Sequence, residues 1–208
     1  MTSLLIATTN LHKVAEIRAI LGEPFHCLTL KDFPRAPNVI EDTDTFAGNA
    51  TKKSRELAQW LSRSRDQSPD FVLADDSGLE VDALKGAPGV HSARFAGLDS
   101  GQAGNSPTAD NNAKLLRLLA DVPLSKRTAR FRCVVALTSL PDLKTELFEG
   151  ACEGRIGFEL LGQGGFGYDP LFTPEGYNQT FGELGEEIKN RLSHRAKALE
   201  KLKCRFGA

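Results

Sequence analysis

The chain has 208 residues, of which 40% are hydrophobic and 25% charged, and these values are typical of soluble globular proteins. They exclude a disordered, collagenous or coiled-coil chain, and the length predicts a single domain over residues 1–208. Because 26 basic and 27 acidic side chains leave a net charge of -1, overall charge does not draw this protein to nucleic acid, and any anion site must be local.

The four cysteines are widely spaced and form no Cys-x-x-Cys pair. We therefore expect reduced structural thiols and a cytoplasmic protein. The apolar run from Leu4 to Ala7 is shorter than the core of a signal peptide or a membrane span, so we expect no membrane association.

The first part of the sequence alternates strand and helix signals. Residues 4–8 form an apolar run that predicts a strand, and from Leu11 apolar residues recur with a helical period as far as Gly22, a typical stop. A second helix is predicted over Thr45–Leu61. Its inward face is expected to comprise Phe46, Ala50, Leu57 and Leu61, and its neighbouring polar stripe Asn49, Lys53 and Glu56.

The apolar run at 71–74 predicts a buried strand that ends at Asp75 and Asp76. Two adjacent carboxylates would then lie at the carboxyl end of a strand, where open α/β sheets usually place ligands. Residues 97–107 contain several Gly, Ala and Pro breaks, which predict a mobile loop before a helix over 108–119.

The C-terminal part predicts a hairpin, an irregular loop and a helix. Residues 130–140 and 145–152 are two strand signals joined by a short turn, a hairpin suited to a dimer interface or a second lobe. The glycines of 162–170 exclude regular structure there. A basic amphipathic helix is predicted after Glu186. Taken together, the predicted strands and helices indicate an α/β fold with a mixed sheet.

The segment Thr8-Thr9-Asn10-Leu11-His12-Lys13 opens a helix directly after a strand. Backbone N–H groups and the positive end of the helix dipole make such a start a phosphate site, and Lys13 adds a full charge. A polar cap with a solvated lysine explains the same residues, and the segment lacks the glycines of a P-loop.

Asp75 and Asp76, together with Glu41 in an earlier acidic loop, form a second candidate site. Adjacent carboxylates repel one another, and a hard cation such as Mg²⁺ relieves that repulsion through oxygen ligands. Bound Mg²⁺ also lowers the pKa of a water molecule, which a carboxylate can then deprotonate. The alternative is an Asp-Ser-Gly turn with a capping aspartate.

The sequence GGFGYDP at 164–170 is a third candidate, because glycines permit positive φ and let an aromatic ring be presented to a nucleobase. Such stacking is worth about 1–3 kcal/mol. A structural loop with Phe166 in the core is the alternative. Lys189 with Ser193-His194-Arg195 is a fourth candidate, for which a solvated helix start is the ordinary explanation. Together the four supply the parts of a nucleotide hydrolase.

In their order along nearly the whole chain, these motifs resemble the inosine triphosphate pyrophosphatases, which hydrolyse non-standard purine nucleoside triphosphates such as ITP, dITP and XTP. The matching residues are Ala7, Thr8, Asn10 and Lys13; Thr45, Phe46, Asn49, Ala50 and Lys53; Ala74 to Leu79; Gly86 to Val90 with Ser92, Ala93 and Arg94; GGFGYDP; and Lys189 with Ser193, His194 and Arg195. Thr43 stands where the family usually has glycine, and 97–107 is longer than usual.

The resemblance implies an elongated mixed sheet with two lobes and a central cleft, a homodimer, and Mg²⁺-dependent hydrolysis to a nucleoside monophosphate and pyrophosphate. It implies that Asp76 is the catalytic proton acceptor and a metal ligand, that Glu41 also binds the metal, and that Asp75 supports both. The residues implied for the triphosphate are Thr8, Thr9, Asn10, Leu11, His12, Lys13, Lys53 and Ser77. Those implied for the base and sugar are Phe166, Gly167, Tyr168, Asp169, Lys189, His194 and Arg195.

On this hypothesis water attacks the α-phosphorus, and Asp76 removes its proton. Arginine and lysine only donate hydrogen bonds, so a purine 6-oxo group satisfies them whereas a 6-amino group does not. We expect the cations to converge on one cleft opposite the carboxylates. The cations are Lys13, Lys53, Lys189 and Arg195, and the carboxylates are Glu41, Asp75 and Asp76.

Two other functions remain open at this point. The Maf-like nucleotide pyrophosphatases are similar in shape and chemistry but act on other bases. A non-catalytic nucleotide- or RNA-binding module would use Phe166 for stacking and the basic C-terminal helix for phosphates. Asp75 and Asp76 argue against that module, because without a metal they would repel phosphate.

Overall fold

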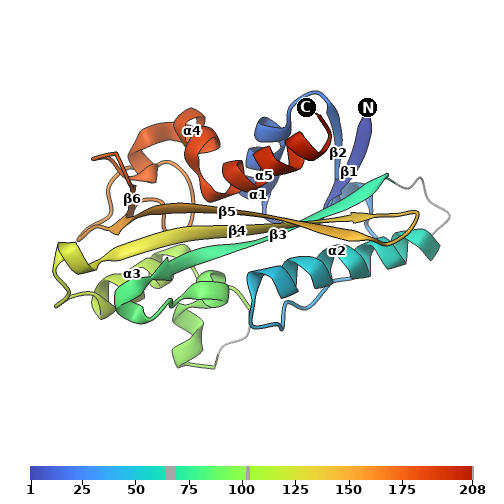
Figure 1. Cartoon of the computed structure of the whole chain (residues 1–208). Helices are drawn as coiled ribbons and strands as arrows, with labels where there is room; N and C mark the ends of the chain where they lie inside the picture. The colour runs from blue at the N-terminus through green and yellow to red at the C-terminus, as the bar shows by residue number, and fades with distance from the viewer. Residues whose placement is uncertain (64–68, 102–103, 208) are drawn as a thin grey trace. The chain divides into compact units, whose positions relative to one another are not determined.

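The protein forms a mixed six-stranded sheet with flanking helices, shown in the computed structural model of Figure 1, which describes residues 1–63, 69–101 and 104–207. The strand order is β2-β1-β3-β4-β5-β6, and β1 lies parallel to both β2 and β3, whereas β5 and β6 are antiparallel. The strands are β1 (Thr2–Ile6), β2 (Phe25–Thr29), β3 (Phe71–Val81), β4 (Thr128–Ser139), β5 (Thr145–Ile156) and β6 (Phe172–Pro174). The predicted α/β class with a mixed sheet is confirmed.

Five α-helices and five short 3-10 helices are assigned in the described ranges. The α-helices are α1 (Leu11–Leu21), α2 (Phe46–Arg63), α3 (Thr108–Leu118), α4 (Phe181–Leu192) and α5 (His194–Arg205). The 3-10 helices are Leu30–Asp32, Asp82–Leu84, Gly89–Arg94, Ala96–Asp99 and Leu124–Lys126. None of the helices in the described part of the chain is long and apolar enough to cross a membrane.

The chain divides into two compact units, each of which takes part of β3, β4 and β5. Unit 1 consists of Met1–Asp76, Cys133–Gly150 and Arg195–Ala208. Unit 2 consists of Ser77–Arg132 and Ala151–His194. The expectation of one domain over 1–208 stays a prediction.

In unit 1, helices cover both faces of the sheet: α1 and α5 lie on one face and α2 on the other (Figure 1). The apolar run of β1 is buried on both faces, because Leu4 and Ile6 pack against α1 and α5 while Leu5 packs against α2. The predicted strand and helix are present, although β1 covers Thr2–Ile6 and not residues 4–8. The predicted stop is confirmed, since α1 ends at Leu21 and is capped by Gly22, whose φ of 69° suits glycine.

Helix α2 has the predicted inward face, and all four of its apolar residues are buried. The neighbouring stripe is not simply a solvated surface, because Asn49 is 1% and Lys53 is 9% exposed. Burying a polar side chain is costly unless it is hydrogen-bonded, so these two residues must have partners inside unit 1.

The expectation that a strand ends at Asp75 and Asp76 is wrong, because β3 continues through them to Val81. The physical reason is that the chain stays extended to place Leu79 and Val81 in the core of unit 2. Pairing of β3 with β1 nevertheless covers only Phe71 to Leu73. The two carboxylates therefore follow the carboxyl end of β1, although they lie within β3.

In unit 2, α3 and α4 lie on opposite faces of the sheet (Figure 1), and the strand residues between them form its core. Strands β4 and β5 are neighbours joined by the predicted short turn, and residues 162–170 contain no helix or strand, as expected. The predicted helix over 108–119 is confirmed as Thr108–Leu118.

Residues 97–107 do not form a loop throughout, because Ala96–Asp99 is a 3-10 helix. The segment is tied to its surroundings by hydrogen bonds from Gly97 N to Ser106 Oγ at 2.9 Å and from Ala96 N to Asn111 Oδ1 at 2.8 Å. The part of the predicted mobile loop at 102–103 lies outside the described residues.

Candidate active site

Asp75 is held ionised in the interior of unit 1 by cations from two helices. Its Oδ2 accepts hydrogen bonds from Arg195 Nη2 at 3.1 Å, Arg195 Nε at 3.2 Å and Cys133 Sγ at 2.9 Å, and its Oδ1 pairs with Lys13. Burial alone would raise the pKa of Asp75, but the charges of Arg195 and Lys13 outweigh burial and hold that pKa well below its usual value. Arg195 also pairs with Glu16 of α1.

Asp76 lies in a different environment, although it is the next residue. It is 6% exposed, and its Oδ2 accepts a hydrogen bond from Asn49 Nδ2 of α2 at 3.0 Å. Burial raises the pKa of Asp76, and the nearby Glu41 carboxylate adds to the rise, while Lys13 and the Asn49 bond oppose it. Consecutive strand residues point to opposite faces, so one carboxylate is directed to α1 and α5 and the other to α2.

Lys53 connects the acidic loop to β3. Its Nζ donates to the backbone carbonyl oxygen of Asp75 at 3.0 Å and pairs with the carboxylate of Glu41. Because Lys53 lies one turn after Asn49 on α2, the same helix face supplies a neutral donor to Asp76 and a cation beside it. The buried part of the polar stripe thus finds its partners at the carboxylates.

Two adjacent carboxyl groups with opposite pKa shifts are suited to different tasks. Asp75, lowered in pKa and fully engaged, is an anchor for cations. Asp76, raised in pKa, is better placed to accept a proton near neutral pH, and such divergence is typical of acid–base sites. The chemistry that the geometry supports is removal of a proton by Asp76 beside lysine side chains.

The predicted phosphate segment is a helix N-terminus, as expected. Asn10 caps α1, because its Oδ1 accepts hydrogen bonds from His12 N at 2.9 Å and Lys13 N at 3.2 Å. Thr8 Oγ1 in turn accepts a hydrogen bond from Asn10 N at 3.2 Å, while Leu11 is exposed. The cap that sequence analysis gave as an alternative is therefore present, and phosphate binding here stays a prediction.

In unit 2, the glycine-rich loop is organised by Asp169. Its Oδ2 accepts hydrogen bonds from Phe166 N at 2.7 Å and from Lys189 Nζ at 2.6 Å. The Lys189 ammonium lies 4.4 Å from the centre of the Phe166 ring, a cation–π contact. A Cβ on Gly165 would collide with the Asp169 carboxylate, and the φ of Gly165 is 73°, so both space and conformation require glycine.

Two predicted ligand-binding side chains of unit 2 lie in its core. Tyr168 is 4% exposed and its hydroxyl donates to the carbonyl oxygen of Ser92 at 2.9 Å, and burial raises its pKa. His194 stacks on Phe131 with ring centres 4.9 Å apart. The Tyr168 ring is therefore not presented to a ligand as expected, and a role for this residue in binding depends on its backbone.

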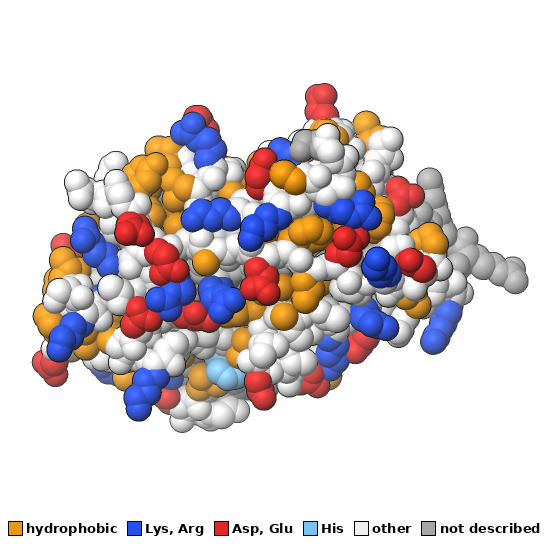
Figure 2. Space-filling view, viewed as in Figure 1, with side chains coloured by type: hydrophobic (Ala, Val, Ile, Leu, Met, Phe, Trp, Pro, Cys, Tyr) orange, Lys and Arg blue, Asp and Glu red, His pale blue; other side chains and the backbone are white. Residues whose placement is uncertain are grey.

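Three of the four predicted cations pair directly with acidic residues of unit 1 and do not stand opposite them. Lys13 and Arg195 pair with Asp75, and Lys53 pairs with Glu41. Lys189 belongs to unit 2, where it pairs with Asp169. On the face drawn in Figure 2, basic and acidic side chains are likewise intermingled.

Two residues of the site, Glu16 and Asn49, were not predicted to have a functional role. Glu16 follows Lys13 by three positions, so the two side chains lie on the same face of α1. Their spacing alone could therefore have indicated that Glu16 lies near the site. Asn49 is four positions before Lys53 and was predicted only as part of a polar stripe. Thr43, noted for replacing glycine, donates to Asn49 Oδ1 from both its backbone N and its Oγ1.

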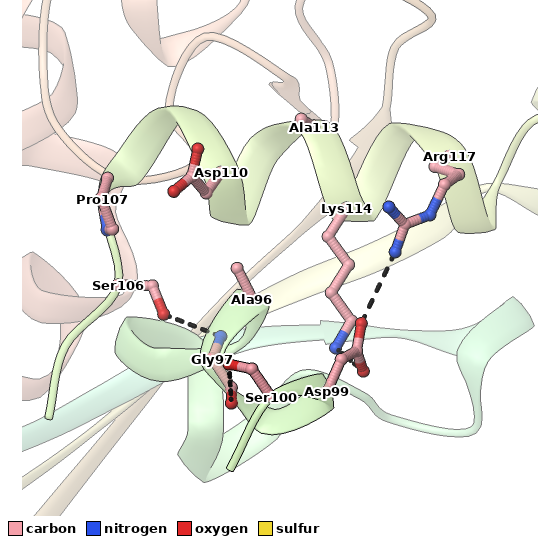
Figure 3. Close-up of a pocket in the computed structure, with 10 residues that line it drawn as sticks. All are labelled: Ala96, Gly97, Asp99, Ser100, Ser106, Pro107, Asp110, Ala113, Lys114 and Arg117. Carbon is pink, nitrogen blue, oxygen red and sulfur yellow. Dashed lines mark hydrogen bonds and ion pairs between the residues drawn. The ribbon is translucent and has the colours of Figure 1, made fainter. Parts of the chain in front are cut away.

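A hollow of about 360 Å³ lies in unit 2 between α3 and the segment before it (Figure 3). Three of its charged residues are mutually engaged: Lys114 Nζ lies 2.7 Å from Asp99 Oδ1, and Arg117 Nη2 lies 3.5 Å from Asp99 Oδ2. Lys114 also donates to the carbonyl oxygen of Phe95 at 2.7 Å. The lysine is thus used for structure, and we assign no chemistry to this hollow.

The mixed sheet, the helix start after β1 and the carboxylates beside it define an α/β protein with a candidate acid–base site. The chain belongs to the Ham1 family, whose pattern matches residues 4–205. This confirms the family resemblance drawn from the motifs.

Similar proteins come from several bacteria. A protein of Desulforamulus reducens named dITP/XTP pyrophosphatase is 50% identical over 201 residues, which cover 95% of this chain and 92% of the relative. One of the same name from Geobacter sulfurreducens is 48% identical over 208 residues, covering 100% and 98%. The solved Ham1 protein of Staphylococcus aureus has a TM-score of 0.83 at 33% identity, covering 99% of this chain and 98% of that one. A HAM1 protein from Coxiella burnetii has a TM-score of 0.82 at 35% identity, covering 100% and 99%.

Proposed function

We propose that this protein hydrolyses non-standard purine nucleoside triphosphates, such as ITP, dITP and XTP, to the nucleoside monophosphate and pyrophosphate. The observation that carries the proposal is the pair Asp75 and Asp76, adjacent carboxylates with opposite pKa shifts beside Lys13 and Lys53. Full-length relatives named dITP/XTP pyrophosphatase support the substrate class.

Magnesium fits the residues present. Within the described ranges, no three His, Cys, Asp or Glu side chains gather closely enough to hold a metal ion on their own. Glu41 and Asp76, however, lie near enough for one charge to raise the pKa of the other. Mg²⁺ is commonly held by one or two carboxylates together with water and substrate phosphates, so these two oxygen donors suit it. When bound, Mg²⁺ would neutralise charge on the phosphates and make a nearby water more acidic.

The residues of unit 1 would perform the hydrolysis. Asp76 accepts a proton from the water that attacks the α-phosphorus, and its raised pKa brings it closer to the operating pH. Lys13 and Lys53 stabilise the negative charge that accumulates on the departing pyrophosphate. Asp75 keeps Lys13 near Asp76, since its Oδ1 pairs with the Lys13 ammonium.

The residues of unit 2 would recognise the base. Lys189 is the donor that we propose for the purine 6-oxo group, and the Phe166 ring beside it is the proposed stacking surface. A 6-amino group would present a donor to the lysine, and a site that leaves buried donors unpaired rejects a substrate strongly. Asp169 fixes this arrangement by bonding both Lys189 and the Phe166 backbone.

We further propose that the protein acts as a homodimer, as the family resemblance implies, and that it is cytoplasmic, as its widely spaced cysteines indicate. Sedimentation of the purified chain tests the dimer directly. A single species with the mass of one 22.6 kDa chain at micromolar concentration would contradict it.

The test of the activity is incubation of dITP with the protein and Mg²⁺, followed by identification of the products. Pyrophosphate and dIMP are expected; orthophosphate and dIDP would contradict the proposal. Parallel reactions with dTTP and UTP separate it from a pyrophosphatase for other bases. Addition of EDTA is expected to abolish turnover, and excess Mg²⁺ to restore it.

The role of Asp76 is tested by Asp76→Asn, which removes the proton acceptor and keeps the shape. Turnover of dITP is expected to fall by at least about a hundredfold, the usual contribution of a general base. Asp42→Asn is a matched control, because Asp42 lies in the acidic loop and its pKa is lowered mainly by a bond from Lys52. Equal turnover in the two variants would show that Asp76 is not the base.

A further inference from the structure

We propose that Thr43 is a positioning residue for the reaction, because it fixes the side-chain amide of Asn49 that donates to Asp76. The inference rests on the proposed role of Asp76 as the proton acceptor. It assigns a task to a side chain of the acidic loop that the proposed mechanism does not otherwise use.

The three side chains form a continuous hydrogen-bonded series within unit 1. Asn49 Oδ1 accepts from Thr43 N at 3.0 Å and from Thr43 Oγ1 at 2.8 Å. Asn49 Nδ2 donates to Asp76 Oδ2 at 3.0 Å. An amide has an acceptor end and a donor end, so two donors at one end and a carboxylate at the other allow only one orientation.

The fit of Thr43 depends on Gly48, the residue before Asn49 on α2. A Cβ on Gly48 would collide with the Thr43 side chain and with Thr45 Oγ1. Gly48 does not have the positive φ that requires glycine, so the reason for glycine here is space. The sequence thus combines a small residue in the helix with a hydroxyl residue in the loop that occupies the room it leaves.

Loss of the hydroxyl would loosen the orientation of the amide. Asn49 Oδ1 would keep only the backbone N–H of Thr43, and a rotated amide would turn its oxygen toward the Asp76 carboxylate. That arrangement is repulsive, so the Asp76 carboxylate would be displaced from its position for part of the time. Because Asn49 is 1% exposed, water cannot easily replace the missing donor.

Thr43 Oγ1 also lies 3.1 Å from the carbonyl oxygen of Thr45. A bond there would serve only the shape of the loop before α2. The experiment must therefore separate an effect on Asn49 from a general effect on the loop. A double-mutant cycle does so, because an effect that passes through the Asn49 amide disappears once that amide is removed.

Four proteins are compared with wild type: Thr43→Val, Thr43→Ser, Asn49→Ala and the double variant Thr43→Val with Asn49→Ala. With dITP as substrate, Thr43→Val is expected to lower kcat by about tenfold, with KM changed less than about twofold. Thr43→Ser keeps the hydroxyl and is expected to restore kcat to within about twofold of wild type. In the Asn49→Ala background, Thr43→Val is expected to change kcat by less than about twofold.

Thr128→Val is the matched control, since Thr128 Oγ1 donates to Asp82 Oδ2 at 2.6 Å in unit 2. It removes the same kind of bond elsewhere and should leave kcat unchanged. If the valine at 43 prevents folding, Thr43→Ala takes its place in the cycle with the same expected results. The proposal is overturned if Thr43→Val keeps kcat within about twofold of wild type, or lowers it equally in both backgrounds.

A second measurement does not depend on turnover. In ¹⁵N-labelled protein, the side-chain amide protons of Asn49 are expected to exchange slowly with solvent, and Thr43→Val to accelerate their exchange by at least about tenfold. Equal exchange in the two proteins would overturn the positioning role. Absence of dITP hydrolysis by wild type would instead contradict the proposed function, so the two failures are distinguishable.

Discussion

Replacing Arg195 with methionine should destabilise the protein strongly, and the loss should shrink in acid. Arg195 is fully buried, and its guanidinium pairs with Asp75 and Glu16. Methionine keeps much of the stem and removes the charge. The substitution therefore leaves two carboxylates in the interior without their main partner.

The expected loss can be bounded from the contacts. Removal of one partner of a buried ion pair usually costs about 3–5 kcal/mol, because the remaining charge stays desolvated. Lys13 still pairs with Asp75 after the change, and the Glu16 side chain is 12% exposed, so both carboxylates keep some stabilisation. We therefore expect the lower end of that range, about 3 kcal/mol at pH 7.

The dependence on pH follows from the direction of the Asp75 shift. The pKa of Asp75 is lowered in the folded wild type. The ion pairs of Asp75 therefore stabilise the folded protein fully above the unfolded pKa of about 3.9, and this stabilisation is lost as the pH falls toward the folded pKa. In the variant the lowering charge of Arg195 is gone, and burial pushes the Asp75 pKa upward. The variant then takes up a proton on Asp75 at higher pH, which removes the incompletely compensated charge. Its deficit in stability relative to wild type therefore shrinks between pH 7 and about pH 4.

Urea unfolding followed by circular dichroism at several pH values measures this difference. The double variant Arg195→Met with Asp75→Asn should recover part of the loss, since the buried carboxylate that lost its arginine partner is then absent. Arg205→Met is the control on the same helix, because Arg205 is 45% exposed where it pairs with Glu146, and it should cost less than about 1 kcal/mol. A loss below about 1 kcal/mol for Arg195→Met, or a loss that is equal at every pH, would refute the reasoning.

Two further outcomes are expected. Gly165→Ala should raise the KM for dITP by at least about tenfold and lower the melting temperature, because the new Cβ collides with the Asp169 carboxylate. Gly176→Ala is the control: Gly176 also has a positive φ but has open space around it, so this variant shows the backbone strain of about 1–2 kcal/mol alone. Equal KM values in the two variants would contradict an effect of the collision. In the native protein an aromatic disulfide reagent should modify the exposed Cys204 first and leave Cys133 unmodified even at pH 9, since burial raises the Cys133 pKa well above its usual value. Mass spectrometry of the modified protein measures the reaction at each thiol. Rapid modification of Cys133 would contradict its burial and show that this part of the interior opens to solvent.

The helices of unit 1 could be predicted because their apolar residues repeat with the period of the helix. The inward face of α2 is an example, since its four predicted positions are all buried. The same periodicity placed Asn49 and Lys53 on a neighbouring polar stripe, but it did not predict that both would be buried. Their burial depends on what β3 places opposite them, and a helix sequence contains no such information.

The course of β3 could not be predicted from local composition. Asp75-Asp76-Ser77-Gly78 has the residues of a turn, and in isolation such residues favour one. The segment is extended because the residues that follow, Leu79 and Val81, are needed in a second core. Tertiary packing thus overrode local preference. No prediction was made for strands β2 and β6, which are short and weakly patterned.

Ion pairs between distant residues were the least predictable part of the site. Arg195 lies 120 positions from Asp75, and no spacing rule connects them. Four cations and three carboxylates were predicted for one site, with the cations on one side of a cleft and the carboxylates on the other. Burial favours direct ion pairs instead, because a charge taken out of water needs its partner in direct contact.

The adjacency of Asp75 and Asp76 explains how one short segment can supply two unlike carboxylates. Side chains alternate across a strand, so the two residues meet different helices even though their Cα atoms are neighbours. Asp75 meets the cations of α1 and α5 and is kept ionised, whereas Asp76 meets the neutral amide of α2 and has a raised pKa. The cations that stabilise the first carboxylate are thereby prevented from lowering the pKa of the second as far as they would in direct contact. An Asp-Asp pair on a turn would lack this separation, so the extension of β3 through the site, which local composition did not predict, is what gives the two residues different chemistry.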